Sequence, residues 1–180
     1  ELGRDYESAA IAYEEARRRG AGRASLQRFV GLRYLRWGRA AMAIEPLQSS
    51  LELAPQHIET RRALAMALSA TGDAERAIEV LRQGVRRAPA DTSLRLALAG
   101  TLVNAGRFAE ALVAYEALMQ SGVSTAAIHV ARGILLHELG RQDEAARAFA
   151  AAVEASPGDR EIEARRDTYR AGLIAPREAP

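Results

Sequence analysis

Glycine recurs at intervals of 34 residues along most of the chain, and an alanine follows each of these glycines by five residues. A fixed period of 20 to 50 residues indicates units that cannot bury their own apolar face and therefore stack on their neighbours. The period predicts a repeat protein, a class that uses extended surfaces for recognition. The glycines are Gly38, Gly72, Gly106 and Gly140, and the alanines are Ala43, Ala77, Ala111 and Ala145.

The glycines set the register of the repeat. If glycine is position 15 of a 34-residue unit, the units span 24–57, 58–91, 92–125 and 126–159, and a half unit spans 1–23. Position 8 is always small, whereas position 24 is always large. The small residues are Gly31, Ala65, Ala99 and Gly133; the large ones are Leu47, Leu81, Tyr115 and Phe149. Position 32 holds Pro55, Pro89, Val123 and Pro157.

Each unit is predicted to form two helices. Positions 20, 24 and 27 fall on one face of a 3.6-residue helix, with a small residue where two backbones approach. The glycine ends the first helix because it adopts the left-handed conformation without steric cost, and the proline stops the second. Short links make neighbouring helices antiparallel. The predicted fold class is therefore all-α, with a helical hairpin repeated about four and a half times.

The pattern resembles the tetratricopeptide repeat over nearly the whole chain: a small residue at position 8, Tyr34 at position 11, then Gly, Ala, a large residue and Pro. This resemblance implies a right-handed superhelical solenoid of antiparallel helix pairs. An RNA-reading helical hairpin of similar period is disfavoured because no polar base-reading pair recurs at a fixed position. The departures from the family pattern are Gln27, Arg61, Arg95 and His129 at position 4, Arg132 at position 7, and Val123 and Ala21 in place of proline.

The two ends and one proline carry local expectations. We expect residues 160–174 to form a helix that caps the stack with a polar outer face, followed by a frayed tail at 175–180. We expect Leu2 and Gly3 to lie in the last turn of a helix whose beginning lies upstream of residue 1. Pro46 falls inside a helix, so we expect a bend near Met42 with the proline on the solvent side.

Composition excludes several kinds of chemistry. All 25 basic residues are arginine and there is no cysteine, so the chain offers no Schiff-base lysine, phosphate-loop lysine, thiol nucleophile or cysteine-bound zinc. His129 and His137 are roughly 12 Å apart along a helix, too far to share a metal by themselves. We predict no catalytic residue, no metal and no cofactor. No apolar run approaches the roughly 20 residues of a membrane span.

Charge is concentrated near the N-terminal end. Eight arginines and no acid lie between Ala16 and Ile44, although the net charge of the chain is only +2. Such a block solvates helices or steers an acidic partner toward the protein. The arginines are Arg17, Arg18, Arg19, Arg23, Arg28, Arg33, Arg36 and Arg39.

The first helix of each unit is apolar almost all round, as in residues 92–105, where Arg95 is the one charged residue. The family resemblance implies that positions 2, 5, 9, 12 and 13 of this helix line a concave groove, which is then basic toward its N-terminal end and apolar toward its C-terminal end. These positions also hold Ser69 and Gly100. The predicted partner-binding residues are Arg28, Leu32, Leu35, Arg36, Arg62, Met66, Leu96, Val103, Asn104, Val130, Ile134 and His137.

These features predict a non-enzymatic scaffold that binds a protein or peptide segment with an apolar face and an acidic end. The family's carboxylate clamp is disfavoured because position 9 holds Leu32, Met66, Gly100 and Ile134. Two alternatives remain open: the protein fills the groove itself, or the repeats are a regulatory or oligomerising domain of a larger enzyme. We expect no nucleic-acid partner. We expect the protein to self-associate through the half repeat, where Ile11 and Tyr13 are partly uncovered.

The compartment is open at this point. The arginine-only usage is one we associate with GC-rich bacterial genomes. We favour a bacterial, periplasmic or envelope-associated location over the cytoplasm, in an assembly protein serving secretion, pili or exopolysaccharide export, by analogy alone.

Overall fold

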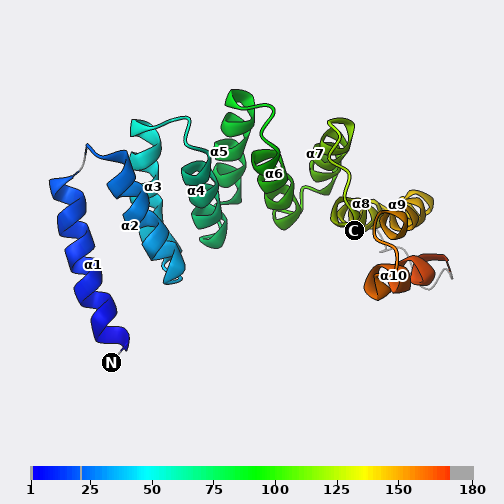
Figure 1. Ribbon diagram of the computed structural model, residues 1–180, viewed down its shortest axis with the longest axis horizontal. Helices are drawn as coiled ribbons and strands as arrows, with labels where there is room; N and C mark the ends of the chain where they lie inside the picture. Colours follow the sequence, from blue (N-terminus) through cyan, green and yellow to red (C-terminus); the bar gives the residue numbers. More distant parts are fainter. Residues whose placement is uncertain (1, 21, 171–180) are drawn as a thin grey trace. The chain divides into compact units, whose positions relative to one another are not determined.

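The computed structural model describes residues 2–20 and 22–170, which form ten α-helices joined by short turns and include no β-strand (Figure 1). The predicted all-α class is therefore confirmed. The helices are α1 (Leu2–Arg19), α2 (Ala24–Arg36), α3 (Ala40–Leu53), α4 (Ile58–Ala70), α5 (Ala74–Arg87), α6 (Thr92–Asn104), α7 (Phe108–Gln120), α8 (Ala126–Glu138), α9 (Gln142–Ala155) and α10 (Arg160–Arg170).

The helices belong to two compact units, and the boundary falls early in α6, with the first unit ending at Leu94 and the second beginning at Arg95. In the first unit, α2 packs against α3, α3 against α4 and α4 against α5, while α1 lies beside α2. In the second unit, α7 packs against α8, α8 against α9 and α9 against α10. Packing between successive helices is the pattern expected of stacked helical hairpins.

The repeated glycines end the first helix of each pair, as predicted. All four at position 15 have positive φ, between 70° and 86°. At Gly38 the turn is closed by two backbone bonds, from Gly38 N to Leu35 O and from Arg39 N to Tyr34 O, both 2.9 Å. A further glycine, Gly122 with φ 87°, follows α7 and explains why Val123 can replace proline at position 32.

Within a 34-residue repeat, the small residue at position 8 of the first helix faces the large residue at position 24 of the second. A Cβ on Gly31 would lie 2.5 Å from Leu47 Cγ, and one on Gly133 would lie 2.8 Å from the Phe149 ring. Position 8 therefore leaves the space that position 24 fills. The alanines at position 20 are fully buried in all four 34-residue repeats, and a larger side chain there would separate the helices.

Arg61 shows how a charged residue occupies position 4, where the family carries a large apolar one. Its side chain is buried, and its guanidinium donates to the carbonyl oxygens of Val80 at 3.1 Å and Pro55 at 2.7 Å. Gly84 leaves room for the aliphatic part, because a Cβ there would collide with Arg61 Cδ. Burial, and the nearby charge of Arg87, lower the pKa of Arg61. The arginine thus packs like a long apolar side chain and joins α5 to the end of α3.

Two local expectations are wrong, the solvent-facing side of Pro46 and the helix end at Gly3. Pro46 is buried, because it shares one face of α3 with Ala43, Leu47 and Ser50, all buried, at the spacing i, i+3, i+4 and i+7. Gly3 does not terminate a helix, since α1 runs from Leu2 through it to Arg19. The in-phase position for a glycine is Arg4, and an arginine does not readily adopt the left-handed turn that stops a helix.

The capping segment is helical over Arg160–Arg170, and most of its described side chains are exposed or half-buried. Residues 171–174 of the predicted cap, the tail 175–180 and Ala21 lie outside the described residues.

Replacing Ala111 with leucine tests the close helix contact at position 20. Ala111 is fully buried, so Ala111→Leu forces helices apart and lowers the free energy of unfolding by about 1–3 kcal/mol. Val113 lies on the same helix but is 65% exposed, so Val113→Leu is a matched control with a change below about 0.5 kcal/mol. Urea unfolding followed by circular dichroism measures both, and equal stabilities would contradict the contact.

Candidate functional site

The predicted partner-binding residues divide evenly between the two units. Arg28, Leu32, Leu35, Arg36, Arg62 and Met66 lie on α2 and α4; Leu96, Val103, Asn104, Val130, Ile134 and His137 lie on α6 and α8. Three helices each expose one large apolar side chain from this set: Met66 on α4 is 56% exposed, Leu96 on α6 38% and Ile134 on α8 37%. Each of these three helices, the first of its repeat, thus keeps one large apolar side chain at the surface.

The second unit contains a hollow between α6, α7 and α8, which we call the Gly100 cleft, with a volume of about 230 Å³. Nothing lies within 4 Å of the place where a Gly100 Cβ would be, so this glycine leaves the cleft open. Val103, Asn104 and Ile134 of the predicted set meet here. The lining residues are Gly100, Val103, Asn104, Phe108, Tyr115, Ala131, Ile134, Leu135 and Glu138.

The walls of the Gly100 cleft are mainly apolar, with a few polar groups. Burial raises the pKa of the Tyr115 hydroxyl, so it stays protonated and able to donate a hydrogen bond at neutral pH. No acceptor for it is found within the described part of the chain. Asn104 is exposed and lines the same cleft. Because Tyr115 is at position 24 of its repeat, the sequence predicted it in the core of the hairpin. No sequence feature indicated that it also lines a surface cleft.

A second hollow, the Tyr169 cleft, has a volume of about 340 Å³ and lies between α8, α9 and α10. The Tyr169 ring packs on Phe149 with centroids 4.5 Å apart and meets the His137 ring edge-on at 5.4 Å. Burial raises the pKa of Tyr169, and the Glu138 carboxylate adds to this effect. The lining residues are Ile134, His137, Phe149, Arg165, Thr168 and Tyr169. Helix α10 of the same chain therefore contacts His137, one of the predicted groove residues.

In the first unit, the predicted basic residues differ in their surroundings. Arg36 and Arg62 are exposed, and the charge of Arg62 helps to lower the pKa of the Asp91 carboxyl. Arg28 instead donates to His57 Nε2, while His57 Nδ1 accepts from Thr60 N at the start of α4. His57 is thus a helix cap, and Arg28 is held by it.

Acids just outside the arginine block neutralise part of its charge. Arg17 pairs with Glu14 at 2.9 Å and with Glu45 at 2.8 Å, and Arg19 pairs with Glu15 at 2.5 Å. The first unit is therefore less positive than the block of eight arginines with no acid between them predicts.

The half repeat exposes apolar surface. Ile11 is 70% exposed, and Tyr13 is half-buried, stacking on Trp37 at 5.6 Å and meeting Phe29 edge-on at 5.5 Å. Ile11 and Met42 lie at a hollow of about 560 Å³, which Glu14, Glu15, Arg18 and Tyr34 also line. The sequence pattern did not indicate Met42 or Phe29 as surface residues.

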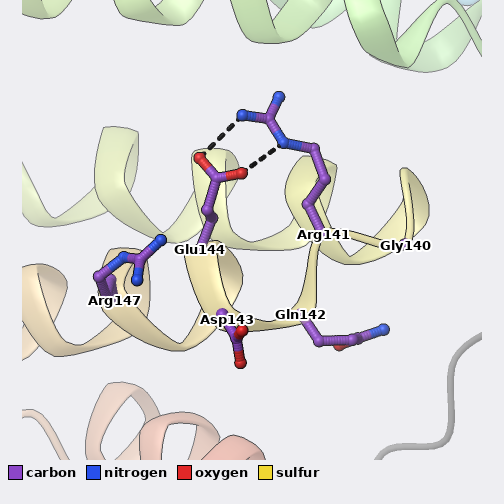
Figure 2. A pocket seen from close by; sticks show the side chains of 6 residues that line it. All are labelled: Gly140, Arg141, Gln142, Asp143, Glu144 and Arg147. Carbon is purple, nitrogen blue, oxygen red and sulfur yellow. Dashed lines mark hydrogen bonds and ion pairs between the residues drawn. The ribbon is translucent and has the colours of Figure 1, made fainter.

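A polar hollow of about 350 Å³ lies at the start of α9, lined by residues 140–144 and Arg147. Arg141 and Glu144 face each other across it and share two hydrogen bonds of 2.7 and 2.8 Å (Figure 2). Their opposite charges satisfy each other, while Asp143 and Arg147 supply one further charge of each sign to the lining.

Residues 2–20 and 22–170 contain no cluster of three or more His, Cys, Asp or Glu side chains able to hold a metal ion. No helix in this part of the chain is both long enough and apolar enough to cross a bilayer.

The chain is a helical-repeat protein. Its hairpins share a left-handed glycine between the two helices and a small residue that faces a large one. Two tetratricopeptide repeat models match it, over residues 58–100 and 96–160, together more than half of the chain. The chain belongs to the tetratricopeptide repeat family, whose fold generally serves as a non-enzymatic scaffold for protein–protein interaction.

Solved structures share this fold. A tetratricopeptide repeat protein of Thermus thermophilus is 24% identical, with 94% of this chain and 92% of that chain covered and a TM-score of 0.63. A MamA structure is 21% identical, with 91% and 94% covered and a TM-score of 0.74. YrrB, described as having an unusual peptide-binding site, is 18% identical, with 96% and 86% covered and a TM-score of 0.73. No curated protein sequence matches the chain.

Two glycines in the second unit offer a matched test of the Gly100 cleft. Gly100→Ala places a methyl group in open space and raises the free energy of unfolding by about 0.5–1 kcal/mol, because alanine favours the helix. Gly133→Ala presses on the Phe149 ring and lowers it. Thermal unfolding compares both variants with the original protein; a destabilising Gly100→Ala would mean that no open cleft exists there.

Proposed function

We propose that the chain is a non-enzymatic interaction module that binds a partner protein segment at the Gly100 cleft. The observation that carries this proposal is the open space above Gly100, beside the exposed side chain of Ile134. An apolar side chain of a partner can enter there and displace water from apolar walls, which is favourable. Asn104 and Tyr115, which also line the cleft, are the residues proposed to make polar contacts there.

The size of the cleft favours a protein segment over a small molecule. Sites for drug-sized ligands measure roughly 300 to 1,000 Å³, whereas the Gly100 cleft measures about 230 Å³. A hollow of this size suits one inserted side chain, and the rest of the segment then contacts the surrounding surface. Leu96, exposed on the same helix as Gly100, adds apolar surface for such contacts.

The first unit supports a second role, the attraction of acidic partners. Arg36 and Arg62 are exposed at the surface of this unit. Exposed charges of one sign raise the rate of encounter with an oppositely charged partner more than they strengthen the complex. We therefore propose that these arginines steer an acidic segment, while apolar contacts hold it.

We further propose that the protein is bacterial and serves an assembly at the envelope, in secretion, pilus formation or exopolysaccharide export. The exclusive use of arginine among 25 basic residues supports the bacterial part, and the process rests on analogy between repeat scaffolds. The alternative is a regulatory or oligomerising domain of a larger enzyme. The complete gene distinguishes them, because a catalytic domain in the same reading frame would favour the alternative.

Filling the cleft should abolish binding. In Gly100→Leu the new side chain occupies the space that the partner needs, and Ile134→Asp places a charge on its wall. We expect both variants to lose the proteins that the original chain captures from its native lysate, with melting temperatures changed by only a few degrees. Val113→Asp, on an exposed part of α7 outside the cleft, should retain them. Unchanged capture by Gly100→Leu would refute the proposal.

Reversing the exposed arginines should affect association more than dissociation. With a captured partner, Arg36→Glu combined with Arg62→Glu lowers the association rate about tenfold at low salt and reduces its salt dependence, since steering is electrostatic. Arg28 is left unchanged because it is bonded to His57. Surface plasmon resonance at several salt concentrations measures both rates. A change confined to the dissociation rate would show that these arginines contact the partner instead of steering it.

A further inference from the structure

Helix α10 places one aromatic ring against the rest of the second unit. The Tyr169 ring lies on the Phe149 ring of α9, with centroids 4.5 Å apart and planes 31° apart, and it meets the His137 ring of α8 at 5.4 Å and 88°. These geometries are close to the offset-stacked and edge-to-face arrangements that aromatic pairs prefer. We call the surface formed by Phe149 and His137 the two-ring seat.

The rest of α10 is held loosely. No described side chain of this helix, residues 160–169, is buried, whereas α9 buries Phe149 and three alanines. Two of its polar side chains bond within the helix itself: Arg165 pairs with Glu161 at 3.0 Å, and Thr168 donates to a carbonyl oxygen one turn earlier at 2.7 Å. These bonds persist when the helix leaves α9. Elements with few buried groups open at a lower free energy than the core.

Space remains beside the two-ring seat although Tyr169 occupies it. The Tyr169 cleft measures about 340 Å³, and Ile134, which lines it, is 37% exposed. Phe149 is only 1% exposed, so α10 hides this ring without filling the space around it. A ring from another molecule can therefore approach beside Ile134 and meets the same two rings once α10 leaves.

The charges around the two-ring seat have both signs. Burial raises the pKa of Tyr169, the Glu138 carboxylate adds to this effect and the Arg165 guanidinium opposes it. Arg165 is in turn paired with Glu161. Because acids and a base offset each other here, charge does not select the ligand, and the rings of the seat do.

We propose that the two-ring seat is a binding site for an aromatic side chain of a partner protein, and that α10 is a displaceable cover whose Tyr169 occupies the seat until the partner takes it. The chemistry of the occupant follows from Tyr169, since an aromatic ring is the group that the seat holds. A partner's ring that replaces Tyr169 remakes both ring contacts, so the exchange loses none of them. This site goes beyond the proposed function, which concerns the Gly100 cleft.

Hydrogen exchange followed by mass spectrometry on the full chain tests the cover. We expect the amides of α10 to exchange at least about tenfold faster than those of α9. Tyr169→Ala should speed exchange in α10 at least about fivefold further, because both ring contacts are lost, while α8 stays protected. Tyr169→Phe keeps the ring and is the matched control, which should match the original protein. Exchange in α10 that is as slow as in α9, or that Tyr169→Ala does not change, would overturn the inference.

The seat itself is probed with N-acetyl-phenylalanine amide, and N-acetyl-leucine amide is the apolar control without a ring. The NMR signal of the Ile134 methyl group reports on both, because this side chain lines the same cleft. We expect the phenylalanine probe to shift this signal, at concentrations at least about threefold lower in Tyr169→Ala, where the seat is vacant. The leucine probe should shift it less in both proteins. Equal responses to the two probes, or a phenylalanine response that Tyr169→Ala leaves unchanged or weakens, contradict the site.

Gly100→Leu separates this inference from the proposed function, because Ile134 also lines the Gly100 cleft. We expect Gly100→Leu to lose the captured partner while the phenylalanine probe still shifts the Ile134 signal. If Gly100→Leu also abolishes the probe response, and Tyr169→Ala does not alter it, the probe enters the Gly100 cleft; the inference is then wrong and the proposed function stands. If Gly100→Leu keeps the partner while Tyr169→Ala strengthens probe binding, the proposed function is wrong and the two-ring seat stands.

Discussion

The structure depends on close contact between the two helices of a hairpin, which two of the hairpins reach by setting a glycine against a large side chain. Gly31 faces Leu47, and Gly133 faces Phe149, so closely that a single methyl group would collide. Because protein interiors are packed without spare volume, this contact fixes how near the two helices lie. In all four repeats the alanine at position 20 is buried and the glycine at position 15 is left-handed.

The features that repeat could be predicted from the sequence, since four in-phase copies average out local exceptions. Helix ends, hairpin contacts and the fold class followed from glycine, alanine and large residues at fixed positions. Pro46 shows the limit of local rules: proline chemistry indicated a solvent-facing bend, but the burial stripe of Ala43, Leu47 and Ser50 includes its position. A helical-wheel reading of that face would have placed it correctly, because apolar burial outweighs the preference of a lone residue.

The candidate site could be predicted only in part, because it arises where copies differ. Exposed Met66, Leu96 and Ile134 occupy positions that the family resemblance indicated. The Gly100 cleft also needs Tyr115, which the register assigned to the core, and the Tyr169 cleft needs a helix outside the repeats. Which side chains line these two clefts depends on how the helices pack against one another, and the repeat pattern in the sequence does not indicate that packing.

Glycine has opposite effects at positions 8 and 9 of the repeat. At position 8, Gly133 lets Phe149 approach, so the absent side chain is replaced by a neighbour and the core gains contacts. At position 9, Gly100 has no neighbour to replace the absent side chain, so the same residue type leaves a hollow at the surface. An empty hollow gives up packing energy and the helical preference of alanine, and a partner's side chain recovers the packing. A glycine that weakens its own helix and opens an apolar hollow therefore fits a binding surface better than it fits a purely structural role.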